Sequence, residues 1–111
     1  MAVTPKRLVA GSQLTTSAAT YYTATSVTTR IDAMALTNTT GGAVTATVHL
    51  VASGGSASAS NCVLSARSLA AGETLIVAGA LGQWLASGGF IQALASAGTS
   101  ITLVASGVEF T

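Results

Sequence analysis

The stretch that decides the fold reads IDAMALTNTTGGAVTATVHLV, from Ile31 to Val51. Its second half, residues 44–51, alternates between apolar residues and threonine or histidine. Successive side chains of a strand point to opposite sides of a sheet, so this period of two predicts a half-buried strand. Residues 31–38 read as a second strand and residues 39–42 as the turn between them. We therefore predict a β-hairpin around which the other strands assemble.

Outside this hairpin the chain is divided into short segments by turn residues, about every eight to twelve positions. Further strands are expected at residues 21–25, 62–66, 74–78, 90–96 and 101–110. The strand at residues 74–78 has few polar residues, so we expect it to be central or buried on both faces. No convincing amphipathic helix interrupts the pattern. The fold predicted is all-β, a single β-sandwich of about seven or eight short antiparallel strands, in jelly-roll or immunoglobulin-like order.

The segments between the predicted strands contain residues that are typical of loops and turns. Residues 53–61 are rich in Gly and Ser and are expected to form a flexible loop. A tight turn is expected at residues 69–74, with Gly72 at positive φ, and a hairpin turn at residues 97–99. Residues 81–85 read as one helical turn or a loop.

The first eleven residues read as an arm that precedes the sandwich. Pro5 cannot donate a hydrogen bond to a sheet ladder, so this part is expected to be extended, with a short edge strand at residues 6–10. The organisation predicted is an N-terminal arm at residues 1–11 and a β-sandwich domain at residues 12–111. Removal of the arm is expected to leave the fold intact and to weaken attachment to a neighbouring subunit.

Composition excludes several function classes. Charged residues make up 6% of the 111 residues and the formal net charge is +1, so the four basic residues cannot build a phosphate-neutralising track. The window between Glu73 and Glu109 is uncharged and long enough to span a bilayer. Its glycines divide it into strand-length pieces, so no membrane span is expected. The surface is expected to consist of Thr, Ser, Ala and Gly, which is easily desolvated against another subunit.

The titratable residues suggest no active site. Asp32 and His49 would be neighbours in the predicted hairpin and form the best catalytic pair, which keeps a small hydrolase open as an alternative. The favoured interpretation places His49 on the solvent face of its strand. One His and one Cys cannot make a zinc site, and no acidic loop offers a calcium site. We expect no enzyme activity, no catalytic or metal-binding residues and no cofactor.

Trp84 is the single tryptophan and lies between two glycines, Gly82 and Gly88. It is expected either to plug one end of the core or to anchor a subunit interface, where Trp is enriched. Tyr21 and Tyr22 point to opposite faces of their strand, so one of them is expected in the core.

Four segments of the chain resemble small virion proteins of tailed bacteriophages. They are SAATYYT (17–23), LTNTT (36–40), VHLVASGGSA (48–57) and LAAGET (69–74). The resemblance implies a β-sandwich protein placed on the capsid surface as a cement or decoration protein. It also implies, as an alternative, a tail, baseplate or fibre component that contacts the host surface or a carbohydrate.

The function expected from this resemblance is structural, on the outer surface of the phage head, at the joints between major capsid proteins. The expected partners are the major capsid protein and further copies of the chain in a dimer or trimer, with no nucleic acid and no membrane. The candidates for protein contact are Thr4, Pro5, Lys6, Arg7, Leu8, Val9, Trp84, Leu85 and Phe90.

Overall fold

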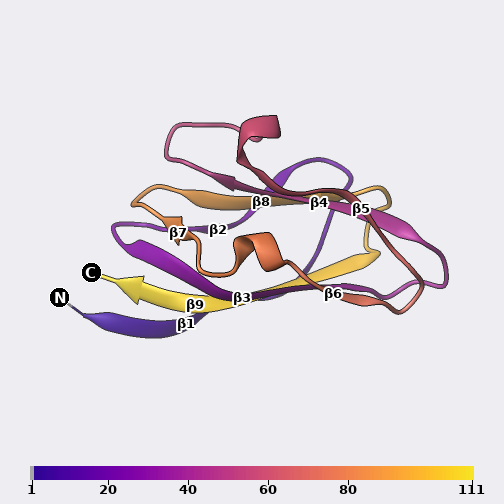
Figure 1. Ribbon diagram of the computed structural model, residues 1–111, viewed down its shortest axis with the longest axis horizontal. Coiled ribbons are helices and arrows are strands. Elements are labelled where there is room, and N and C mark those ends of the chain that lie inside the picture. The colour runs from indigo at the N-terminus through magenta and orange to yellow at the C-terminus, as the bar shows by residue number, and fades with distance from the viewer. Residues whose placement is uncertain (1) are drawn as a thin grey trace.

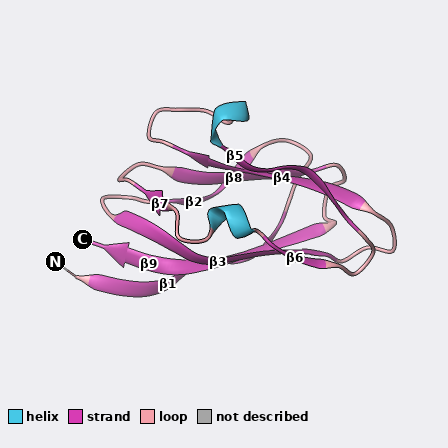
Figure 2. Cartoon of the chain, in the orientation of Figure 1, coloured by secondary structure: helices cyan, strands magenta, loops and turns pink. Residues whose placement is uncertain are grey.

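The computed structural model describes residues 2–111, which form two antiparallel β-sheets packed face to face (Figure 1). Figure 2 shows that helix is confined to two single turns between strands. In chain order the elements are β1 (Val3–Gln13), β2 (Ala19–Thr23), β3 (Thr28–Asn38), β4 (Val44–Val51), η1 (Ala59–Asn61), β5 (Cys62–Leu69), β6 (Thr74–Ile76), η2 (Ala78–Ala80), β7 (Trp84–Leu85), β8 (Phe90–Ala95) and β9 (Ile101–Phe110). The predicted all-β sandwich is confirmed.

The strand order is nested. Sheet A has the order β1-β9-β3-β6, with β7 pairing β3 beside β6, and sheet B has the order β2-β8-β4-β5. Strands of the first half of the chain thus pair with strands of the second half in reverse sequence. These antiparallel pairs are then joined within each sheet, because β9 also pairs with β3 in sheet A and β8 also pairs with β4 in sheet B. This is the order of a jelly roll, one of the two orders that the sequence left open.

The hairpin predicted over residues 31–51 is wrong, although both of its strands exist. β3 lies in sheet A and β4 in sheet B. The connection is a corner built on Asn38, which is fully buried. Its Nδ2 donates to the backbone oxygens of Gly42 (2.7 Å) and Leu69 (3.0 Å), and its Oδ1 accepts from the backbone nitrogen of Thr40 (2.9 Å). These hydrogen bonds stabilise the turn by which the backbone passes from sheet A into sheet B.

Two more expectations about connectivity are wrong. The turn at residues 97–99 joins β8 of sheet B to β9 of sheet A, so it is a second corner and no hairpin. β9 already has β1 and β3 on its two sides and cannot also pair with β8. The strand predicted as central at residues 74–78 is the short edge strand β6, in which Ile76 is 56% exposed.

The core lies between the sheets and is filled by aliphatic side chains of both. Ile31, Leu36 and Leu103 from sheet A meet Val48 and Ile91 from sheet B, and none of them is exposed. Burial of each such side chain contributes about 1.5–3 kcal/mol to folding. The alternation that predicted β4 as a half-buried strand is therefore confirmed on its inner face.

The tight turn at residues 69–74 is also confirmed. Gly72 has φ +73°, in the region that favours glycine. The Glu73 carboxylate closes the turn by accepting a hydrogen bond from the backbone nitrogen of Ala70 at 2.7 Å.

Most of the predicted arm lies in edge strand β1, which pairs with β9 from Val3 opposite Phe110 to Gln13 opposite Thr102. The predicted domain boundary after residue 11 falls inside this strand. Its two bulges, together with a proline and two cationic side chains, make the edge a poor template for aggregation. The two chain ends lie side by side at one end of the sandwich (Figure 1).

Candidate interaction surface

The predicted catalytic pair is not formed, because Asp32 and His49 lie in different sheets. Asp32 is exposed on β3, and its Oδ1 accepts a hydrogen bond from Nε of Arg30 at 2.8 Å. His49 is 9% exposed, so its predicted place on the solvent face is wrong. Its Nδ1 donates to the Ser58 carbonyl oxygen (3.1 Å) and to Oδ1 of Asn61 (2.9 Å). His49 therefore fastens the loop that contains η1 onto β4.

Tyr22 belongs to a second polar group, enclosed between the sheets. Its hydroxyl donates to Oε2 of Glu109 at 2.5 Å and lies 2.7 Å from Oγ1 of Thr29. Burial, reinforced by the hydrogen bond to Glu109, raises the pKa of Tyr22 to about 12. Nζ of Lys6 lies 3.4 Å from the same carboxylate oxygen. The phenol thus stays protonated near neutral pH and joins the sheets as a hydrogen-bond donor.

Residues 2–111 contain no group of three or more His, Cys, Asp or Glu side chains that could hold a metal ion. Within the same range, no helix is both long and apolar enough to cross a membrane.

Exposed large apolar side chains concentrate on sheet A. Four such residues occur in the described part of the chain: Val3 (57% exposed), Ile76 (56%), Leu81 (38%) and Trp84 (55%). Three lie on strands of sheet A, and Leu81 follows η2 on the way to β7. Apolar side chains gathered on one face of a molecule mark an interaction site more strongly than scattered ones. The outer face of sheet A is therefore the candidate interaction surface.

The most prominent feature of this face is a group that we call the aromatic cluster: Arg30, Trp84 and Phe110. The two rings have centroids 5.3 Å apart and are tilted by 32°. The guanidinium carbon of Arg30 lies 5.9 Å from each ring centroid. Asp32 holds the other side of the guanidinium by two hydrogen bonds, at 2.8 and 3.4 Å. These contacts hold the exposed indole ring of Trp84 in one position before a partner binds, so less side-chain entropy is lost on binding.

A shallow apolar groove lies further along the same face. Its volume is about 140 Å³, and its floor includes Ala33, Ala35 and Val104. Ile76 and Leu81 form its wall on the side of β6. The small floor residues leave room for a protruding apolar side chain.

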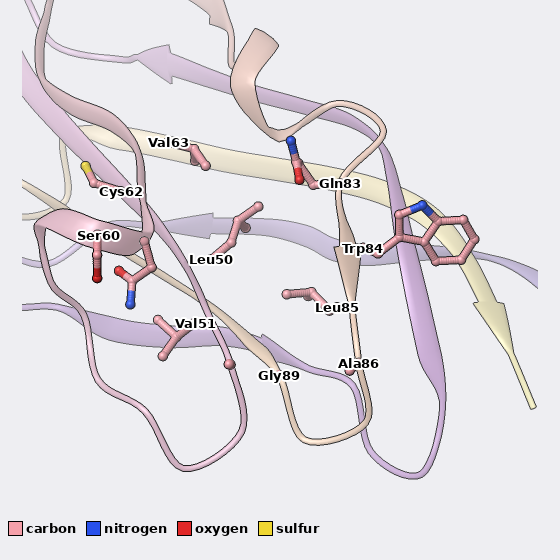
Figure 3. A pocket seen from close by; sticks show the side chains of 12 residues that line it. Leu50, Val51, Ser60, Cys62, Val63, Gln83, Trp84, Leu85, Ala86 and Gly89 are labelled. Atoms are coloured by element: carbon pink, nitrogen blue, oxygen red, sulfur yellow. The ribbon is translucent and has the colours of Figure 1, made fainter.

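A larger pocket of about 430 Å³ lies where β4 and β5 face the segment that contains β7 (Figure 3). Its lining combines apolar residues such as Leu50 and Leu85 with the amides of Asn61 and Gln83. Of the residues that the structure describes, no His, Asp, Glu, Lys or Arg lines this pocket, and Cys62 is the one titratable side chain in its lining. Figure 3 shows the Trp84 ring at its rim, pointing away from the other labelled side chains.

The predicted contact residues divide into two groups. The exposed ones are Thr4, Pro5, Lys6 and Arg7 on β1 and Trp84 on β7. Leu8, Val9 and Leu85 are buried in the core of the chain, so they offer no surface, and Phe90 is half-buried.

The prediction that Trp84 plugs the core is wrong. β7 pairs with β3 so that Trp84 lies opposite Arg30 and Leu85 opposite Thr29. Thr29 faces the core, which turns Leu85 inward and Trp84 outward. Sequence reasoning missed Arg30 and Phe110 as its neighbours, because only the pairing of three separate strands brings them together.

Comparison of the chain with protein-family models, with curated proteins and with solved structures gave no match. The resemblance to virion proteins of tailed bacteriophages therefore stays a prediction.

Proposed function

We propose that this chain is a structural protein of a tailed-bacteriophage particle, a capsid cement or decoration protein. It binds the outer surface of the head and stabilises the joints between major capsid proteins. The observation that carries the proposal is that sheet A presents two surfaces to other chains, the outer edge of β1 and an outer face with exposed large apolar side chains. A face of this kind suits a protein that works by binding, and the resemblance to virion proteins selects the phage particle as its location.

Two further properties support this function. A charged fraction of 6% lets the surface lose its hydration at little cost when it packs against other subunits. Jelly rolls are frequent in viral capsid proteins, which is support by analogy of fold alone. Many copies on one shell would add up weak contacts into firm attachment.

The free edge of β1 is the segment that we assign to the shell. Thr4, Lys6 and Arg7 are exposed along it, and within residues 2–111 no strand pairs with its outer side. A shell subunit can contact the exposed side chains of this edge, whereas its bulges and Pro5 disfavour main-chain pairing along its whole length. This assignment leaves the outer face of sheet A free for contacts between copies of the chain.

The experiment mixes the purified chain with phage heads that lack it, and measures cosedimentation and cryo-electron microscopy density on the shell. We expect density at symmetry-related positions on the head. Thr4→Asp should reduce occupancy, whereas Ser65→Asp, which adds the same charge to exposed edge strand β5 of sheet B, should not. Equal occupancy of both variants would remove β1 as the attachment segment. Failure of the wild-type chain to bind heads would overturn the proposal.

A tail or fibre protein that contacts carbohydrate is the second candidate. It is favoured by Trp84, whose exposed ring offers a stacking platform at the rim of the larger pocket beside the Gln83 amide. Because Trp84 is the only tryptophan, its fluorescence reports binding directly. A saturable change on titration with host surface glycans, together with no binding to heads, would support this candidate instead.

A further inference from the structure

We propose that the larger pocket binds a neutral sugar that carries an acetamido group, and that Trp84 stacks against the next sugar of the same oligosaccharide. The inference does not depend on attachment to phage heads. It rests on the second candidate function, contact with carbohydrate, and names the class of sugar that this site takes.

The pocket exists because one side of the sandwich is only partly closed. On that side sheet A ends in β7, which has two residues, and sheet B ends in β5, which belongs to the other layer. Leu50 and Val63 stay partly exposed there, although they pack against the core. Together with buried Leu85 they give the pocket an apolar wall. An apolar group of a ligand gains free energy by covering these side chains.

A tight turn closes one end of the pocket. The backbone nitrogen of Gly89 donates to the Ala86 oxygen at 2.8 Å, directly after β7. A Cβ on Gly89 would lie 3.0 Å from that oxygen and 3.3 Å from the Val51 oxygen, so the backbone is closely packed at this point. The pocket is therefore formed before a ligand arrives, which lowers the cost of binding.

Uncharged polar side chains line the same pocket, among them the amides of Asn61 and Gln83. The Asn61 amide is held in place, because its Oδ1 accepts hydrogen bonds from His49 and the Ser58 backbone, and its Nδ2 donates to Ser56. Within residues 2–111 that bond uses one of the two N–H groups on Nδ2, so the other remains for a ligand. The Gln83 side chain is exposed and offers both a donor and an acceptor.

The lining disfavours charged ligands. Among the residues that the structure describes, no Asp, Glu, Lys or Arg lines the pocket. A phosphate, carboxylate or ammonium group would lose its hydration there without a counter-ion, which is unfavourable. The volume of about 430 Å³ lies toward the lower end of the range for small-molecule sites, about 300–1,000 Å³, so the occupant is a small neutral unit.

An acetamido sugar combines the groups that this lining requires. Its methyl group is apolar and can cover Leu50 and Val63, while its amide N–H and oxygen match the acceptor and the donor of Gln83. A ring hydroxyl can accept from the remaining N–H of Asn61. A sugar without the acetamido group leaves the apolar wall uncovered, and a purely aliphatic ligand leaves the amides unpaired.

Trp84 extends the site beyond the pocket. Its ring is 55% exposed at the rim and points away from the other labelled side chains, so a sugar inside the pocket does not stack on it (Figure 3). Phe110 and Arg30 hold the ring from the side of sheet A. A sugar ring has a face of C–H groups, for which an exposed aromatic ring is a matching surface. The next sugar of a chain that leaves the pocket can therefore stack on the indole.

Isothermal titration calorimetry of the purified chain with the β-1,4-linked trimer of N-acetylglucosamine tests the site. Cellotriose, the same trimer without acetamido groups, is the matched ligand control. We expect saturable binding of the acetamido trimer and at least roughly tenfold weaker binding of cellotriose. Equal affinity for the two trimers would overturn the proposal. So would the absence of saturable binding up to about 10 mM for both this trimer and N-acetylgalactosamine.

Variants separate the two parts of the site. Ala86→Phe places a ring in the pocket from an exposed position and should abolish binding of the acetamido trimer, whereas Ala18→Phe, exposed in the loop before β2, should not. Trp84→Ala should weaken binding of the trimer by roughly tenfold and leave binding of the single sugar N-acetylglucosamine unchanged. All three variants should keep the wild-type circular dichroism spectrum, because these side chains are exposed. Full binding by Ala86→Phe, or equal losses for trimer and single sugar in Trp84→Ala, would overturn the assignment.

This proposal and the capsid function can fail independently, since sugar binding is measured on the isolated chain and attachment on phage heads. A chain that binds heads and no sugar removes only the pocket assignment. A chain that binds sugar and no heads removes the capsid function and supports the second candidate. Loss of head attachment in Ala86→Phe, without sugar binding by the wild-type chain, would overturn the sugar site and show that a protein partner fills the pocket.

Discussion

The Tyr22 hydroxyl of sheet B donates a hydrogen bond to the Glu109 carboxylate of sheet A. Together with the contact to Thr29, it joins the two layers through polar atoms in a mainly aliphatic interior. Lys6 approaches the carboxylate from β1, so three strands and two sheets meet at one oxygen atom. The raised pKa of Tyr22 follows from this enclosure and makes the contact measurable.

Stability at alkaline pH is the first prediction. The phenol of Tyr22 titrates at about 12 in the folded chain and at about 10 in the unfolded chain. Because the folded pKa is the higher one, the contribution is complete below about pH 10 and is lost as the pH rises through about 12. The free energy of unfolding should fall by at most about 2.7 kcal/mol over this range. Urea unfolding of the wild-type chain and of Tyr22→Phe, compared across this range, measures the difference. Parallel pH profiles of the two proteins would contradict it.

Substitution of Glu109 should change the same titration. In a Tyr21→Phe background, Tyr22 is the only tyrosine, so ultraviolet difference absorbance follows it alone. Glu109→Gln removes the negative charge that contributes to the shift, so the pKa of Tyr22 should fall. It should still lie above the ordinary value, because burial is the larger cause. An unchanged pKa would show that the carboxylate has no part in the shift.

Gly107 should be intolerant of any side chain. A Cβ at this position would overlap the backbone oxygen of Arg30, inside the pairing of β9 with β3. Gly107→Ala must therefore separate the two strands, and we expect a loss of about 3 kcal/mol or more in the free energy of unfolding. Gly98→Ala is the control, since a Cβ there meets nothing within 4 Å. Thermal or urea unfolding compares them, and equal midpoints would refute the steric argument.

The Asn38 corner should be a second sensitive point. Asn38→Ala leaves the buried backbone oxygen of Leu69 without the amide donor, and an unpaired buried group costs about 1–3 kcal/mol. The exposed Gly42 loses one of the two donors to its backbone oxygen and keeps the Thr40 hydroxyl at 3.1 Å. We expect a loss of about 3 kcal/mol in urea unfolding. Thr40→Ala removes only a half-exposed hydroxyl of the same corner and should cost less than about 1 kcal/mol. Similar losses for the two variants would mean that the corner does not depend on the Asn38 amide.

Removal of residues 1–11 is the fifth prediction, and it reverses the expectation from sequence. The deletion strips most of β1 from β9 and removes the buried side chains of Leu8 and Val9. We expect a large loss of stability in place of an intact fold. Leu8→Ala alone should cost about 2–4 kcal/mol, measured by urea unfolding, whereas exposed Thr4→Ala should be nearly neutral. A truncated chain with a wild-type unfolding midpoint would restore the view of this segment as a separate arm.

The positions of the strands were readable from sequence because alternation is a local property. Residues 44–51 and 101–110 were predicted with the bounds that β4 and β9 have. Pairing was not readable, because it depends on which strands share a sheet. The side chain of Asn38 bonds to its own backbone two residues on, a feature of turns in general. Only its further bond to Leu69 marks it as a corner between sheets.

The candidate surface was predicted only in part, for the same reason. Trp84 was identified as a candidate for subunit contact, but whether its ring points outward depends on the pairing of β7 with β3. Arg30 and Phe110 lie 80 residues apart in sequence and meet only because β9 pairs with β3. No local pattern contains that information.

The nested order of the strands has a consequence for biosynthesis. Among the strands of residues 2–111, β1 pairs only with β9, so the strand of this range that is synthesised earliest finds its partner only when the latest has been made. Sheet A therefore assembles only after Ile101–Phe110 has been made, and the nascent chain must stay soluble without it. Pro5, Lys6 and Arg7 at the start of the waiting strand are well suited to that interval, since proline and cationic side chains discourage premature pairing with other nascent chains.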